Sequence, residues 1–125
     1  MINILKNYYF FTASITLSMI VLLLVPLSTL PKIHSPLFPV DKLVHLILFM
    51  TWMLSFLLET KQRLSILSIF IIGICLALST ELLQLATKNR QFDIFDAMYD
   101  ATGLLAGLWV YGAIVLVRRN KKNKK

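Results

Sequence analysis

The stretch LSILSIFIIGICLALSTELLQLA, residues 64–86, decides the fold of this 125-residue chain. It contains no charged side chain before Glu81, and Glu81 and Gln84 lie close to its end. A helix needs about 20 predominantly apolar residues to cross a bilayer, so this stretch predicts a transmembrane helix. A helix is favoured over a strand because every backbone polar group inside a bilayer must be satisfied within the protein.

The composition of the whole chain agrees with that prediction. Hydrophobic residues make up 58% of the sequence and charged residues only 15%. A soluble domain is about half apolar and about a quarter charged, and so short a chain could not bury the excess. The composition therefore excludes a water-soluble domain and, because disorder requires low hydrophobicity, an intrinsically disordered chain.

Four apolar runs separated by short polar breaks cover about residues 8–30, 43–58, 64–86 and 94–117. The second run is short for a membrane span unless Asp41 and Lys42 cap it at the interface, whereas the other three are long enough. We interpret the first run as a retained helix because no cleavage pattern of small residues follows it. The sequence thus predicts an all-α, four-helix transmembrane bundle in one domain, residues 1–117, with a basic tail at 118–125.

The distribution of lysine and arginine predicts the orientation of the bundle. The net charge is +7, and six of the thirteen basic residues lie in the last eight positions. Nine basic residues fall on the side of the two termini and four on the other side, and an excess of basic residues marks the cytoplasmic side. We therefore expect a multi-pass protein of the inner (plasma) membrane with both termini in the cytoplasm. Because the basic tail directly follows an apolar run, it indicates a membrane flank, and we expect no nucleic-acid partner.

Ionisable side chains near the ends of the apolar runs are the main functional signal, since each costs free energy unless it faces protein or water. In the expected topology they all lie in the outer half of the bilayer. These candidate ligand-binding residues are Asp41, His45, Glu81, Gln84, Arg90, Asp93, Asp96 and Asp100.

Helical spacing gives these groups a common direction. One stripe of the third run contains Gly73, Ala77, Glu81 and Gln84, and one stripe of the fourth contains Asp93, Asp96, Asp100, Gly103 and Gly107. Small residues at this spacing allow close packing of membrane helices. We therefore expect the carboxylates to point into the bundle.

Several polar residues also have a structural explanation. Asp41 and Asp93 each precede an apolar run and are candidate N-caps. Lys42 is interpreted as a lysine that snorkels to the interface. The single cysteine, Cys75, is interpreted as a small buried apolar residue. One cysteine excludes an intramolecular disulfide and a cysteine-based metal cluster, and we expect no cofactor.

Buried carboxylates need a cation, several hydrogen bonds or a proton. Glu81 lies roughly 7 Å inward from the end of its helix, at 1.5 Å per residue. Arg90 is the best candidate partner, because its planar guanidinium suits carboxylates. The sequence predicts one cluster of Glu81, Arg90 and Asp96 with His45 at its edge, and a purely structural ion-pair network is the alternative.

Taken together and in order, these motifs resemble the VanZ-like family of small integral membrane proteins. The matching elements are Asp41-Lys42-x-x-His45, Glu81-x-x-Gln84, Arg90-x-x-Asp93-x-x-Asp96, Gly103 and Gly107. The family usually has Asn where this chain has Asp100. Because the family is named for an accessory protein linked to resistance to the glycopeptide teicoplanin, the resemblance implies a cell-envelope role without implying a reaction.

Three functions fit these features. The first is a non-enzymatic envelope protein whose polar cluster binds a membrane lipid, an envelope precursor, a glycopeptide-related ligand or a membrane-protein partner. The second is a membrane enzyme that acts on a lipid-linked or surface substrate, with His45, Glu81 and Asp96 as catalytic candidates or hard-cation ligands. A small transporter is third, because its site is expected near the midplane, whereas these acids lie at one end.

Overall fold

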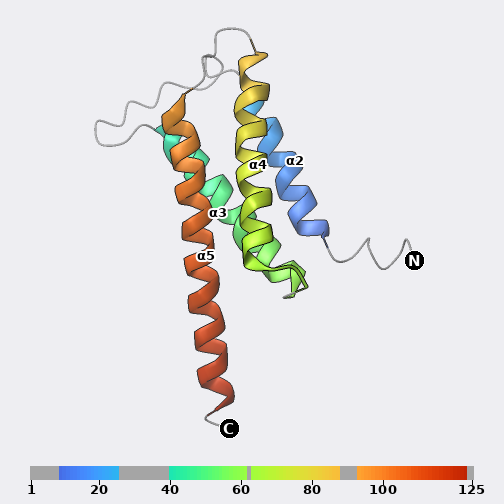
Figure 1. Cartoon of the computed structure of the whole chain (residues 1–125), viewed down its shortest axis with the longest axis vertical. Helices are drawn as coiled ribbons and strands as arrows, with labels where there is room; N and C mark the ends of the chain where they lie inside the picture. The colour runs from blue at the N-terminus through green and yellow to red at the C-terminus, as the bar shows by residue number, and fades with distance from the viewer. Residues whose placement is uncertain (1–8, 26–39, 62, 88–92, 124–125) are drawn as a thin grey trace, which may run out of the picture.

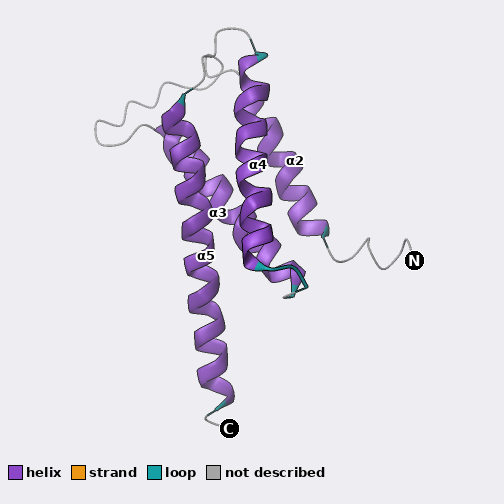
Figure 2. Cartoon of the chain, in the orientation of Figure 1, coloured by secondary structure: helices purple, strands orange, loops and turns teal. Residues whose placement is uncertain are grey.

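The computed structural model describes residues 9–25, 40–61, 63–87 and 93–123, which form four α-helices (Figures 1 and 2). The helices are α2 (Phe10–Leu24), α3 (Val40–Thr60), α4 (Ile66–Leu85) and α5 (Ile94–Lys122). Successive helices run in alternate directions through the bundle (Figure 1). The predicted all-helical fold is confirmed.

The first helix, α2, is shorter than its apolar run predicted. It has 15 residues, which span about 22 Å at 1.5 Å per residue, against about 30 Å for the hydrocarbon core. Val25 is already extended, with φ −63° and ψ 126°. Pro26 explains this end, because proline disfavours the α conformation in the residue before it. The rest of the predicted first span lies outside the described residues.

The other three helices are each long and apolar enough to cross a bilayer, which makes the chain a multi-pass membrane protein. The apolar run behind α3 looked short, but the helix has 21 residues because its first turn includes Asp41 and Lys42. Helix α5 has 29 residues and continues through the start of the expected basic tail as far as Lys122. Basic side chains in its last turn favour this extension, since they face the negative end of the helix dipole.

Two glycines bring α3 and α5 into backbone contact. A Cβ atom on Gly103 would collide with the carbonyl oxygen of Leu46. A Cβ atom on Gly107 would lie 2.6 Å from the carbonyl oxygen of Met50, closer than real Cβ atoms approach. The predicted packing stripe of α5 is therefore confirmed, and its glycines set the distance between the two helices.

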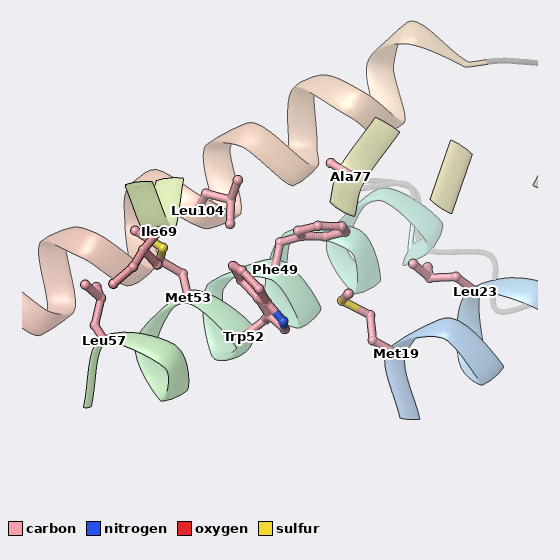
Figure 3. Packing of buried hydrophobic residues seen from close by; sticks show 9 residues of the cluster. All are labelled: Met19, Leu23, Phe49, Trp52, Met53, Leu57, Ile69, Ala77 and Leu104. Carbon is pink, nitrogen blue, oxygen red and sulfur yellow. The ribbon is translucent and has the colours of Figure 1, made fainter. Parts of the chain in front are cut away.

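Figure 3 shows the apolar core that these helices enclose. It consists of Met19, Leu23, Phe49, Trp52, Met53, Leu57, Ile69, Ala77 and Leu104. The indole Nε1 of Trp52 donates a hydrogen bond to Thr16 Oγ1 at 2.9 Å. The core therefore links α2 to α3 by a polar contact as well as by apolar packing.

The expectation that Cys75 is buried is wrong, because its side chain is exposed. Helix α4 buries Gly73, Ala77 and Glu81 along one face. Each residue turns the helix by about 100°, so Cys75 lies on the opposite face from this stripe.

Glu59, near the end of α3, caps the start of α2. Its carboxylate accepts hydrogen bonds from the backbone N–H groups of Phe11 and Thr12 at 2.8 and 2.9 Å, and from the Thr12 hydroxyl at 2.5 Å. N–H groups in the first turn of a helix have no partner within it, and the helix dipole there is positive. A carboxylate from α3 thus fixes the start of α2 against its neighbour.

Candidate polar site

The starts of α3 and α5 and the end of α4 lie at the same end of the bundle (Figure 1). Four ionisable side chains from these helices are almost completely buried there. They form the buried polar cluster, with exposed fractions of 1% for His45, 1% for Glu81, 6% for Asp96 and 0% for Asp100. The predicted inward direction of the three carboxyl groups is confirmed, whereas His45, predicted at the edge of the cluster, is as deeply buried as they are.

His45 of α3 is held by Asp100 of α5. The Nδ1 atom of His45 lies 2.9 Å from Asp100 Oδ1, and its Nε2 atom lies 3.9 Å from Asp96 Oδ2. The shorter distance is a hydrogen bond in which Nδ1–H donates to the Asp100 carboxylate. This contact fixes the plane of the imidazole ring and directs Nε2 toward Asp96.

Lys42 forms two ion pairs at the edge of the cluster. Its Nζ atom lies 2.7 Å from Asp93 Oδ2 and 2.8 Å from Asp96 Oδ1. The hydrogen bond from the Lys42 ammonium, supported by the backbone N–H of Phe95, holds the pKa of Asp93 below its ordinary value. The sequence indicates mainly a snorkelling lysine at this position, although Lys42 is also one of the cations available on this side of the bundle to pair with the carboxylates. In the sequence, a lysine at the start of a membrane helix looks the same whether it snorkels to the interface or pairs with carboxylates of another helix.

The two candidate N-caps differ in the structure. The side chain of Asp93 accepts a hydrogen bond from the Phe95 N–H at 2.8 Å, so its capping of α5 is confirmed. Asp41 lies in the first turn of α3 instead, because the helix begins at Val40. The Asp41 side chain is partly buried and forms no hydrogen bond or ion pair with another described residue.

Glu81 of α4 faces the groups from α3 and α5. One ligand atom each of His45, Glu81 and Asp96 lies within 4.8 Å of the others. Within the described part of the chain, Glu81 Oε1, His45 Nε2 and Asp100 Oδ2 are buried without a hydrogen-bond partner. The cluster thus contains polar atoms that the protein itself leaves unsatisfied in the described ranges.

The side chain of Gln84, another predicted member of the site, hydrogen-bonds to α2. The Gln84 amide Nε2 donates a hydrogen bond to the carbonyl oxygen of Leu23 at 3.1 Å. This hydrogen bond links the end of α4 to the last turn of α2. Arg90, the predicted partner of Glu81 and Asp96, lies outside the described residues.

Chemically, the buried polar cluster combines three carboxyl groups with one imidazole. This combination favours a cation or a group rich in hydrogen-bond donors, because an anion would be repelled by the carboxylates. An imidazole held by a carboxylate can also transfer a proton. No described hydroxyl or thiol hydrogen-bonds to His45 Nε2.

Fold and site together define a class of small multi-pass helical membrane protein with a buried acidic cluster at one end. The family model for VanZ/LLP1 matches residues 2–116, and the chain belongs to this family. The match confirms the resemblance seen in the motifs and extends it over the first apolar run. No match is found among curated proteins or among solved structures.

Proposed function

We propose that the buried polar cluster is the ligand-binding site of a cell-envelope protein. The ligand is the head group of a membrane lipid or of a lipid-linked envelope precursor. The observation that supports this proposal is the pair of buried atoms, His45 Nε2 and Glu81 Oε1, that have no partner among the described residues. An unsatisfied buried polar group costs about 1–3 kcal/mol, and a bound ligand that supplies its partner removes that cost.

The charges of the site favour a zwitterionic head group. The carboxylates of Glu81 and Asp96 would accept hydrogen bonds from an ammonium group. Lys42 lies at the edge of the cluster, where its ammonium, in addition to its ion pairs with Asp93 and Asp96, could contact the phosphate of the same head group. A head group that carries both an amine and a phosphate fits this arrangement of charges.

The proposed orientation places the cluster in the outer half of the plasma-membrane bilayer, with both termini in the cytoplasm. It is supported by the nine-to-four distribution of basic residues. Single cysteines at Thr87 and at Asn120, each in a Cys75→Ala background, test it. A membrane-impermeant thiol reagent should label only the Thr87 variant in intact cells. Labelling of only the Asn120 variant would place the cluster on the cytoplasmic side.

Native mass spectrometry of the detergent-purified protein tests head-group binding. The wild-type protein should carry a co-purified lipid that Glu81→Gln loses. Glu59→Gln is the matched control, because it makes the same chemical change at the opposite end of α3, and it should keep the lipid. Equal lipid occupancy in all three proteins would contradict the proposal. In cells that depend on the protein for teicoplanin resistance, Glu81→Gln should lower the resistance and Glu59→Gln should not.

A membrane enzyme is the second candidate, and the His45–Asp100 hydrogen bond favours it. In this alternative His45 Nε2 takes a proton from a water molecule whose oxygen attacks a lipid-linked or surface substrate. Glu81 or Asp96 gives a proton to the leaving group as its bond to the attacked atom breaks. Mass spectrometry of lipids in proteoliposomes would detect turnover. His45→Gln should then abolish turnover and leave lipid binding in place, whereas intact lipids after incubation with the wild-type protein would exclude the tested substrates.

A further inference from the structure

We infer that His45, Glu81 and Asp96 bind one divalent transition-metal ion of the zinc type, and that Asp100 positions His45 for this purpose. The inference goes beyond head-group binding, because it concerns an ion held by the protein's own side chains. This ion would take the place of the head group's ammonium at Glu81 and Asp96, so that only the phosphate of the head group would bind beside it.

The three side chains come from three different helices and converge on one point. Their ligand atoms lie within 4.8 Å of one another, and His45 Nε2 is 3.9 Å from Asp96 Oδ2. Two ligands of a tetrahedral zinc ion, each about 2.1 Å from the metal, are roughly 3.4 Å apart. Small side-chain movements would therefore bring the three atoms to coordination distance.

Hydrogen bonds already orient two of the three groups. Because His45 Nδ1–H donates to Asp100, the lone pair of the neutral imidazole is on Nε2. A metal-bound histidine usually donates its other ring N–H to a carboxylate in this way. Lys42 occupies Asp96 Oδ1, which leaves Oδ2 as the atom nearest to His45 Nε2.

The unpartnered atoms are an independent indication of a ligand. His45 and Glu81 are both 1% exposed, and neither Nε2 nor Oε1 has a hydrogen-bond partner in the described ranges. A divalent cation would satisfy both lone pairs and offset the charges of the carboxylates. In an ordinary acidic patch on a protein surface the side chains are exposed, and water satisfies their hydrogen-bonding atoms.

The ligand types favour zinc-like ions over calcium and magnesium. Calcium takes six to eight oxygen ligands, and magnesium is bound by oxygen and water, whereas imidazole nitrogen suits zinc and its neighbours. Three protein ligands leave a fourth position of a tetrahedral ion open. A water molecule or a phosphate oxygen could occupy that position.

The test uses full-length protein purified in detergent without a polyhistidine tag, stripped with EDTA and dialysed against buffer containing Zn²⁺. Elemental analysis and native mass spectrometry should find one zinc ion per wild-type chain. Glu81→Gln and Asp96→Asn should lose it, and Glu59→Gln should keep it. Asp100→Asn retains a hydrogen-bond acceptor for His45 and should weaken zinc affinity by about 10–100-fold.

Circular dichroism and gel filtration identify which variants are folded. A zinc-free wild-type protein, or a folded Glu81→Gln or Asp96→Asn variant that binds zinc as tightly as the wild type, would overturn the inference. If neither variant folds, X-ray absorption of the wild-type protein decides, since it should show one imidazole together with oxygen ligands. Zinc and lipid add separate masses in the same spectrum, so failure of zinc binding is distinguishable from failure of lipid binding.

Discussion

The contact between α3 and α5 at Gly107 predicts a large effect from a single methyl group. In Gly107→Ala the new Cβ would lie 2.6 Å from the Met50 carbonyl oxygen, whereas ordinary contact begins at 3.4 Å, so the helices would have to separate by about 0.8 Å. Overpacking of this kind costs about 1–3 kcal/mol. Thermal unfolding in detergent, followed by the fluorescence of the buried Trp52, should show a Tm that is lower by roughly 4 °C or more.

The matched control is Gly112→Ala on the same helix. A Cβ at Gly112 would meet nothing within 4 Å in the described structure. Alanine is a better helix former than glycine by up to about 1 kcal/mol, so this variant should melt at the same temperature as the wild type or higher. Equal Tm changes in the two variants would refute the idea that glycine sets the distance between α3 and α5.

Three further predictions concern polar contacts. Because Lys42 lowers the folded-state pKa of Asp93, this carboxylate stabilises the fold above its unfolded pKa of about 3.9 and progressively less as the pH falls below it. Asp93→Asn, which keeps a capping side chain, should therefore lower Tm at pH 6 and have less effect as the pH falls below about 4. Glu59→Gln should cost about 1–2 kcal/mol, measured as faster amide exchange in the first turn of α2. Trp52→Phe should lower stability by at least about 1 kcal/mol through loss of its hydrogen bond to Thr16, measured as a fall in Tm.

Specific results would contradict each of these three. A Tm difference between wild type and Asp93→Asn that is constant from pH 6 to pH 3 would show that its charge is not coupled to folding. Faster exchange along α5 as well as α2 in Glu59→Gln would indicate global rather than local destabilisation. A Trp52→Phe variant as stable as the wild type would mean that its indole hydrogen bond contributes nothing to stability.

The inward faces of α4 and α5 could be predicted from sequence because bilayer helices follow a simple rule. Small residues and ionisable groups at helical spacing face protein. This rule correctly predicted the burial of Glu81, Asp96 and Asp100. The early end of α2 could also have been predicted from the sequence, because Pro26 disfavours the helical conformation of Val25.

The individual pairings could not be predicted, because they depend on how one helix is rotated and shifted against another. Lys42 meets Asp93 and Asp96 across 51 and 54 residues of sequence. Glu59 reaches Thr12 across 47 residues, yet an acidic residue near a helix end looks like any interfacial carboxylate. The glycine contacts fix the relative positions of α3 and α5. The spacing of residues along one helix does not tell which residues of the other helix they will contact.

The charges at the two ends of α5 have a consequence for the chain in an energised membrane. The helix begins with Asp93 and Asp96 and ends with Arg119, Lys121 and Lys122. Its 29 residues extend over about 43 Å, at 1.5 Å per residue, and the two sets of charges lie near opposite ends of this length. Moving one elementary charge across a membrane potential of 100 mV changes its free energy by about 2.3 kcal/mol. In the proposed orientation an electric field that is negative inside draws the basic end inward and the acidic end outward, so the membrane potential itself favours the inserted helix.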